Sequence, residues 1–258
     1  MKPLRKTSTP VSPSSGKFHQ RAIQFHYSAI ELLVALLLFF VATPFMDILP
    51  NGELIESILL TLVMVSAVLA TGGKRRILAV ALVLITPALI GKWLNFFAPS
   101  LVSISVLLVA TVVFFAFIVG QLLIFILHAP RVDTNVLCAG LAGYLMLGLL
   151  WIPIYELTAQ LTPSAFAFNT GLHEGTMKGF NAFYFSLVTL STVGYGDVAP
   201  VSRVARMLAI MEAISGLFYM AVLVSHLVAV HSTQNWSEQT TTSATDTDTD
   251  TDTDAESQ

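Results

Sequence analysis

Six long apolar runs account for most of this sequence and limit what it can fold into. They lie at residues 28–46, 54–71, 77–97, 101–127, 135–157 and 204–230. A helix needs about 17 to 25 apolar residues to cross the hydrocarbon core of a bilayer, so each run is long enough. The sequence therefore predicts an all-α integral membrane protein with six transmembrane helices. Pro87, Gly91 and Lys92 interrupt the third run, so we expect its outer end to fray early.

The composition agrees with this prediction and excludes several classes of function. Only 11% of the 258 residues are charged, and the mean hydropathy is +0.75, whereas roughly a quarter of a soluble domain is charged. The net charge of −3 provides no basic surface for nucleic acid. Cys138 is the single cysteine, so no intrachain disulfide can form. No nucleophile–base pairing, metal-ligand spacing or phosphate-binding loop stands out, and we expect neither an enzyme nor an organic cofactor.

The distribution of basic residues predicts the orientation. Cytoplasmic loops carry an excess of lysine and arginine. Nine of the 13 basic residues precede the first run or lie in the second-to-third and fourth-to-fifth connections: Lys2, Arg5, Lys6, Lys17, Arg21, Lys74, Arg75, Arg76 and Arg131. We therefore expect both termini in the cytoplasm, residues 158–203 on the outer side, and a location in the plasma membrane or a cell inner membrane.

A seventh apolar run, residues 180–190, is too short to cross the bilayer, and the string TLSTVGYGDVAP follows at 189–200. Non-helical backbone at membrane depth is tolerated only where protein buries it or where it lines a water-filled path. Gly194 and Gly196 accept backbone angles that other residues avoid. The interleaved glycines would let successive carbonyl groups turn toward one axis and replace the hydration shell of a monovalent cation. The short run is therefore interpreted as a re-entrant helix that enters from the outer side.

The string TVGYGD resembles the signature of the tetrameric potassium-channel superfamily. The similarity extends over FNAFYFSLVTLSTVGYGDVAP and covers residues 134–230, so that 135–230 would form a pore domain. It implies a homotetramer in which each chain contributes one filter strand. K⁺, the permeant ion, would bind the carbonyl groups of Thr192, Val193, Gly194 and Tyr195, with Gly196 completing the filter.

The resemblance also implies roles for residues around the filter. Asn181 stands at the expected start of the pore helix, where its side chain would cap free amide groups. Tyr184 and Phe185 replace the paired tryptophans of many relatives in the aromatic ring that supports the filter. Val188 stands where some relatives place a glutamate, so Asp197 would lack that partner and filter inactivation would be affected.

The sixth run is interpreted as the inner helix. Gly216 lies where related channels often carry a hinge glycine, although close helix packing is the alternative. Met220, Val224 and Val228 would line the inner pore, unless they face lipid or a neighbouring helix. Glu212 is a carboxylate within the membrane, and we expect it to face the pore helix or a neighbouring subunit as a structural acid. Participation of His226 and His231 in gating stays open.

The first four runs, residues 28–127, resemble the sensor-like unit of six-helix channels only in number and position. Gating charges are needed because each contributes only about 2.3 kcal/mol per 100 mV, yet residues 101–127 contain no lysine or arginine. We therefore expect no functional voltage sensor. The linker 128–134 is short, so the four-helix unit should pack beside the pore of its own subunit. Residues 1–27 form a basic cytoplasmic segment, and the acidic tail 231–258 should be disordered.

These observations favour a potassium-selective channel that is not gated by voltage, with four copies of the chain and membrane lipid as partners and no nucleic acid. Three alternatives stay open. The altered aromatic ring is also compatible with a weakly selective cation channel. A potassium-transport subunit would resemble four fused repeats with one filter glycine each, whereas this chain has one repeat with two. A non-conducting membrane sensor would have no need of an intact filter.

Overall fold

The computed structural model describes residues 15–46, 48–71, 75–97, 103–129, 133–169 and 175–253. In this part of the chain, seven α-helices accompany a 3₁₀ turn, Thr43–Phe45, and two short strands, β1 (Phe166–Phe168) and β2 (Val198–Pro200). The helices are α1 (Ser15–Ala42), α2 (Gly52–Ala70), α3 (Arg75–Phe97), α4 (Ile104–Leu127), α5 (Thr134–Leu161), α6 (Phe180–Leu190) and α7 (Arg203–Thr253).

Five of these helices are long and apolar enough to cross a membrane: α2, α3, α4, α5 and the first part of α7, Arg203–Ala229. The first predicted span corresponds to a shorter apolar stretch, Ala29–Phe45, which is at the lower limit of crossing length. The chain is therefore a mainly helical membrane protein. The expected early fraying of the third helix is not observed, because α3 continues through Pro87 and Lys92 to Phe97.

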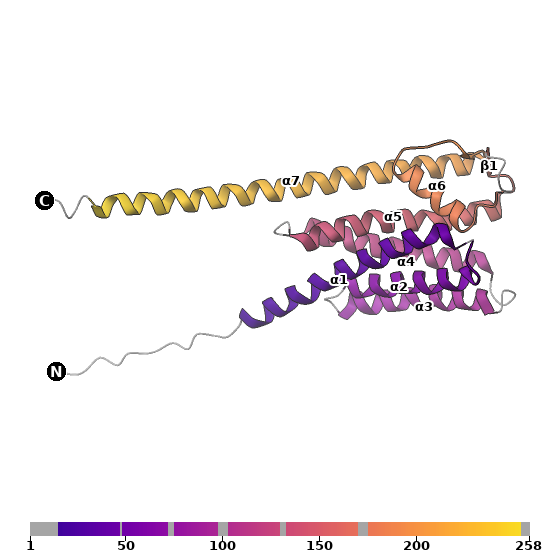
Figure 1. Ribbon diagram of the computed structural model, residues 1–258, viewed down its shortest axis with the longest axis horizontal. Coiled ribbons are helices and arrows are strands. Elements are labelled where there is room, and N and C mark those ends of the chain that lie inside the picture. Colours follow the sequence, from indigo (N-terminus) through magenta and orange to yellow (C-terminus); the bar gives the residue numbers. More distant parts are fainter. Residues whose placement is uncertain are drawn as a thin grey trace.

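The helices form a bundle in which α1 and α4 pack along α5 (Figure 1). The apolar side chains of α1, α2, α3, α4, α5, α6 and α7 belong to one continuous buried core. Phe39 and Phe40 of α1 also contact Phe183 of α6 edge to face, with ring centroids 6.2 and 4.8 Å apart. The four-helix unit thus packs beside the predicted pore domain of its own chain, residues 135–230, which we call the pore segment, as the short linker predicted.

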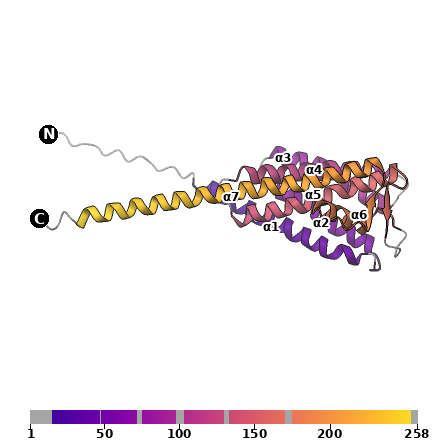
Figure 2. The ribbon, with the colours of Figure 1, turned by 90° about the horizontal axis from the view of Figure 1, so that it is seen from above.

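Helix α7 extends well beyond the rest of the bundle in both views (Figures 1 and 2). It runs to Thr253, so the structure differs from the disordered tail expected from residue 231. The sequence contains neither glycine nor proline after Gly216, and nothing local interrupts the helical hydrogen bonds. The side chains of 230–253 and of 15–28, which include the latter part of the predicted basic N-terminal segment, lie outside the described residues, as do residues 1–14 entirely.

Strands β1 and β2 form a small antiparallel sheet at the end of the bundle where α6 lies (Figure 1). Phe166 pairs with Pro200 and Phe168 with Val198. A second apolar cluster underlies the sheet and joins it to α5, α6 and α7: Tyr155, Ala165, Phe166, Met177, Ala182, Phe185 and Ala205. The sheet and this cluster therefore hold the segment before α6 and the segment after the 191–196 loop in place.

Candidate functional site: the 191–196 loop and its supports

Helix α6 begins at Phe180, as the apolar run predicted. Its N-cap is Gly179, with φ of 51°, and the Gly179 amide donates to Glu156 Oε1 of α5 at 3.3 Å. The expected capping by Asn181 is wrong, because its side-chain amide instead donates to the Thr176 carbonyl at 3.0 Å. Asn181 lies one residue inside the helix, too late to accept from the first free amides. Glu156 was missed, although an acidic residue inside a predicted span is a signal in itself.

The C-terminal end of α6 is satisfied by the loop that follows it. The last four carbonyl groups of a helix have no partner within the helix. Here the Leu187, Val188 and Thr189 carbonyls accept from amides of residues 191–194, with N···O distances of 2.9 to 3.3 Å. The fourth, at Leu190, accepts from the Tyr144 hydroxyl at 3.4 Å. The loop thus begins as a direct continuation of the helix end.

The backbone of the loop alternates in the sign of φ. Thr192, Gly194 and Gly196 have φ values of 60°, 55° and 81°, whereas Val193 and Tyr195 are not in this region. Glycine adopts positive φ at little cost, but threonine does so rarely. Alternation of this kind lets successive carbonyl groups face the same side. Both glycines therefore adopt backbone angles that other residues avoid, as the sequence predicted.

The loop side chains have little cover from their own chain. Val193 is 55% and Tyr195 73% exposed. Large apolar side chains at such exposure leave a surface that is suited to packing against another protein surface. The backbone of the loop is therefore hydrogen bonded to the end of α6, whereas its Val193 and Tyr195 side chains are exposed.

The far end of the loop is tied to the segment before α6. The Asn169 side-chain amide donates to the Gly196 carbonyl at 2.8 Å, and its backbone amide donates to the Asp197 carbonyl at 2.7 Å. Asn169 directly follows β1, so the β1–β2 pairing places it beside the loop. Nothing in the sequence pattern pointed to Asn169, because a three-residue strand carries too little periodicity to be recognised.

Tyr184 of α6 supports the loop by two contacts. Its hydroxyl donates to Asp197 Oδ2 at 2.7 Å, and its ring stacks on Tyr195 with centroids 6.5 Å apart. The expectation that Asp197 would be left without a side-chain partner needs correction, since a tyrosine takes the place of the glutamate. The Tyr184 hydroxyl lowers the pKa of Asp197, because a donor to the ionised form stabilises it.

The other two predicted supports act differently from Tyr184. Phe185 is buried away from the loop, where it packs edge to face on Tyr155 and Phe166 with centroids 4.9 and 5.5 Å apart. Val188 supports the loop through its backbone, since its carbonyl accepts from both Val193 and Gly194. Of the two predicted aromatic supports, Tyr184 places its ring against the loop and Phe185 does not.

Gly216 of α7 touches the end of α6. A Cβ atom built at Gly216 would lie 2.5 Å from the Leu190 carbonyl oxygen, so this contact requires glycine. The geometry favours the packing alternative for Gly216, and its role as a hinge stays a prediction. Met220, Val224 and Val228 are exposed on the single chain, which leaves their predicted pore-lining role untested.

Glu212 of α7 is fully buried and faces α6 and α5 of its own chain. Ser186 Oγ lies 2.6 Å from Glu212 Oε1, and the Tyr155 hydroxyl hydrogen bonds to Oε2. This agrees with the prediction of a structural acid facing the pore helix.

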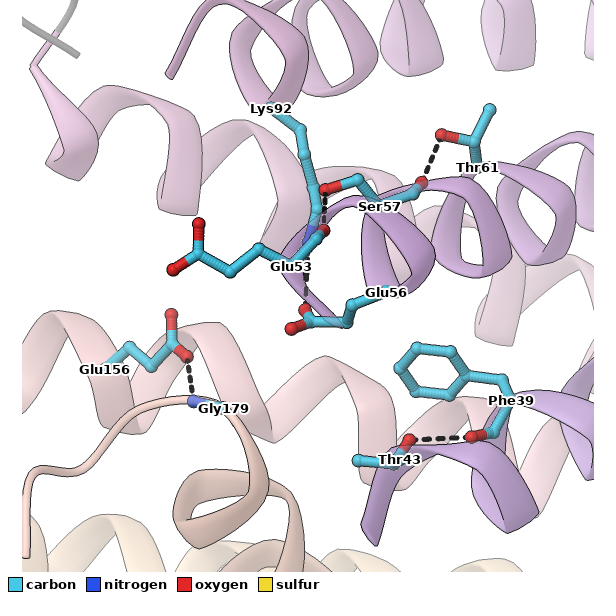
Figure 3. Close-up of polar contacts among 9 residues, drawn as sticks. All are labelled: Phe39, Thr43, Glu53, Glu56, Ser57, Thr61, Lys92, Glu156 and Gly179. Atoms are coloured by element: carbon cyan, nitrogen blue, oxygen red, sulfur yellow. Dashed lines mark hydrogen bonds and ion pairs between the residues drawn. The ribbon is translucent and has the colours of Figure 1, made fainter. Parts of the chain in front are cut away.

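Charged side chains of the four-helix unit lie near Glu156, which contacts the start of α6 (Figure 3). Lys92 of α3 pairs with Glu56 of α2 at 3.0 Å. Figure 3 shows this pair on the side of the bundle where Glu156 accepts from Gly179. Helix α4, where relatives with sensors place their charges, contains no lysine or arginine.

Comparison with known proteins finds similarity in the C-terminal half of the chain. Residues 136–232 match the family model described as ion channel. The chain is 50% identical over 52 residues to the voltage-gated potassium channel Kch of Escherichia coli, a match that covers 17% of this chain and 12% of that protein. It is 41% identical over 49 residues to two-pore potassium channel 4 of Arabidopsis thaliana, covering 19% and 17%.

A third similar protein is the calcium-gated potassium channel TvoK of Thermoplasma volcanium, which is 40% identical over 50 residues, covering 19% of this chain and 14% of that protein. The chain thus spans less than a fifth of the length of each of these relatives. No solved structure matches it significantly. The family match covers α5, α6, the loop and the membrane part of α7. The segment 136–232 is thus similar to the ion-channel family and to proteins described as potassium channels.

Proposed function

We propose that this chain is one subunit of a homotetrameric, potassium-selective channel that conducts K⁺ passively through a filter built from Thr192–Gly196. The observation that carries the proposal is the loop backbone, in which φ is positive at alternate residues and both glycines lie in the positive region. Such a backbone is able to present a row of carbonyl dipoles to a dehydrated cation. The Thr192 hydroxyl would complete the innermost site.

Four copies are required because each chain supplies a single filter strand. The exposed Val193 and Tyr195 side chains support this assembly, since neighbouring subunits would cover them. Met220, Val224 and Val228 would then surround the inner pore, where apolar rings close a pore by dewetting. Six membrane crossings would leave both termini in the cytoplasm, with the loop facing the outer side.

The C-terminal end of α6 would point inward at a cation-filled cavity. Its last carbonyl groups carry the partial negative charge of the helix dipole, and all four accept hydrogen bonds from the loop or from Tyr144. The carbonyl groups at this end of α6 would therefore hold the filter in place by hydrogen bonds. Their partial negative charge would also favour a cation on the pore axis. A weakly selective channel is the second candidate, because one tyrosine within the chain replaces the larger aromatic ring of relatives.

Cation flux from liposomes that contain the purified protein tests the proposal. We expect flux under a K⁺ gradient to exceed flux under an equal Na⁺ gradient by at least about 100-fold, which corresponds to about 2.8 kcal/mol of discrimination. Gly194→Ala should abolish the flux, because alanine at a φ of 55° is strained. Equal fluxes of the two ions would support the weakly selective channel, and undiminished flux in the variant would refute the filter assignment.

We also propose that opening is not driven by voltage. Helix α4 has no basic residue that could move through the membrane field. Open probability should change little between about −100 and +100 mV, the range over which gating charges would supply the energy for opening. A steep rise of open probability within this range would contradict the proposal.

A further inference from the structure

Three buried side chains from three helices meet behind the filter loop. We call Tyr155 of α5, Ser186 of α6, Glu212 of α7 and the carbonyl group of Gly148 the carboxyl cluster. Ser186 Oγ lies 2.6 Å from Glu212 Oε1 and 2.8 Å from the Gly148 carbonyl oxygen. The Tyr155 hydroxyl is hydrogen bonded to Glu212 Oε2. All three side chains have no exposed surface.

Glu212 has no cationic partner in the part of the chain that the structure describes, since no lysine, arginine or histidine pairs with it there. The elements packed on this part of α7 are α5, α6 and β2. The titratable groups of α5 near Glu212 are Tyr155 and Tyr144, the single tyrosine of α6 is bound to Asp197, and β2 has none. An ionised carboxylate buried without a cation is costly.

The number of hydrogens decides the protonation state. The carboxyl cluster contains three oxygen–oxygen contacts at hydrogen-bond distance. Tyr155 and Ser186 supply one hydroxyl hydrogen each, a carbonyl oxygen supplies none, and an ionised carboxylate supplies none. With Glu212 ionised, one of the two contacts of Ser186 would join two lone pairs. With Glu212 protonated, each contact contains one hydrogen.

From this count we infer that Glu212 is a neutral carboxylic acid and that its proton fastens the inner helix to the pore helix. Glu212 donates to Ser186, Ser186 donates to the Gly148 carbonyl, and Tyr155 donates to Glu212. Glu212 is thus a positioning residue, which acts on the filter through Ser186.

The carboxyl cluster lies close enough to the filter to set its position. Ser186 is two residues before Val188, whose carbonyl accepts the amides of Val193 and Gly194. One turn further along α7, Gly216 contacts the Leu190 carbonyl. The two contacts fix the register between α7 and α6, one by hydrogen bonding and one by close packing.

The protonation state is tested in the intact protein by infrared difference spectroscopy of wild type against Glu212→Gln. The wild type should show the carbonyl band of a carboxylic acid that shifts in D₂O and is missing from the variant. A difference spectrum with only carboxylate bands would refute the inference. This readout needs no ion conduction, so its failure is separate from a failure of the proposed channel function.

The positioning role, which rests on the proposed function, is tested by flux and thermal unfolding of three variants. Glutamine has an amide that donates to Ser186 and an oxygen that accepts from Tyr155, so Glu212→Gln should keep K⁺ flux within about threefold of wild type. Glu212→Leu and Ser186→Ala remove the connection, and each should reduce K⁺ flux about tenfold, the factor expected for one buried hydrogen bond. Each should also lower the unfolding temperature.

Two results would overturn the positioning role. The first is a flux loss in Glu212→Gln as large as that in Glu212→Leu. The second is normal flux and stability in Ser186→Ala, the variant that keeps the carboxyl group and serves if Glu212→Leu does not fold.

Discussion

The pore segment and the four-helix unit are held together by different interactions. In the pore segment, polar side chains connect separate elements: Tyr184 to Asp197, Asn169 to Gly196, and Tyr219 of α7 to the Gly140 carbonyl of α5. In α1 to α4, most side-chain hydroxyl groups bond to a carbonyl of their own helix, as Thr111 does to Leu107 at 2.9 Å. The pore geometry is therefore specified by directional contacts, whereas the four-helix unit relies on apolar packing, which tolerates change more readily.

The largest contrast is expected from the same substitution in the two regions. Gly216→Ala places a Cβ 2.5 Å from the Leu190 carbonyl, whereas Gly120→Ala in α4 meets nothing within 4 Å. Overpacking costs about 1–3 kcal/mol, so Gly216→Ala should lower the unfolding temperature by roughly 3–10 °C and reduce K⁺ flux. Gly120→Ala should leave the flux unchanged and should not lower the unfolding temperature, because alanine favours a helix over glycine. Equal behaviour of the two variants would contradict the difference between the regions.

Acid sensitivity should distinguish Tyr184→Phe from wild type. The Tyr184 hydroxyl lowers the pKa of Asp197. The stability that this hydrogen bond contributes is therefore complete above the ordinary aspartate pKa of about 3.9 and is lost only below it. Wild-type K⁺ flux should stay constant as the outer pH falls from about 8 to 4. In Tyr184→Phe, the hydroxyl no longer lowers the pKa of Asp197, so K⁺ flux should begin to fall at a higher pH than in wild type. Asp197→Asn has no carboxyl group to protonate, so its K⁺ flux should not show this fall. Identical pH profiles for wild type and Tyr184→Phe would show that the hydrogen bond does not control the filter.

A smaller difference is expected between two hydroxyl deletions. Tyr219→Phe removes a buried contact of 2.9 Å between α7 and α5, and interhelical hydrogen bonds in membranes average about 0.6 kcal/mol. Its unfolding temperature should fall by about 1–3 °C. Thr111→Val removes only a bond within α4 and should have no measurable effect. Comparable losses in calorimetry would mean that both regions depend equally on side-chain hydrogen bonds.

The smallest effect is expected at the Lys92–Glu56 ion pair of the four-helix unit. Both side chains are about one-third exposed, and pairs of this kind contribute about 0–1 kcal/mol. Glu56→Gln should change stability slightly at low salt and less at high salt. A large, salt-independent loss would show that this pair supports the start of α6 more strongly than its exposure indicates.

Much of the fold was predictable because apolar length is a strong signal. Helix α6 has the bounds that its apolar run predicted, 180–190, and both loop glycines have the positive φ that glycine accepts. The continuation of α7 to Thr253 was not predicted, because acidic composition argued for disorder while the absence of helix-breaking residues argued against it.

The supports of the loop were less predictable, for a physical reason. Tyr184 and Asp197 are 13 residues apart and meet only because the chain reverses between them. Asn169 reaches the loop through a sheet of two three-residue strands. Gly216 carried two interpretations in the sequence, and only the position of Leu190 favours packing. Contacts of this kind depend on tertiary distance, which periodicity does not encode.

The reversal potential of single channels in a planar bilayer tests the central claim most directly, with mostly K⁺ and little Na⁺ on one side and the reverse mixture on the other. If four copies of Thr192–Gly196 form a carbonyl-lined filter, the reversal potential should lie close to the equilibrium potential of K⁺. A reversal potential near zero in wild-type protein would contradict potassium selectivity and with it this assignment of the loop.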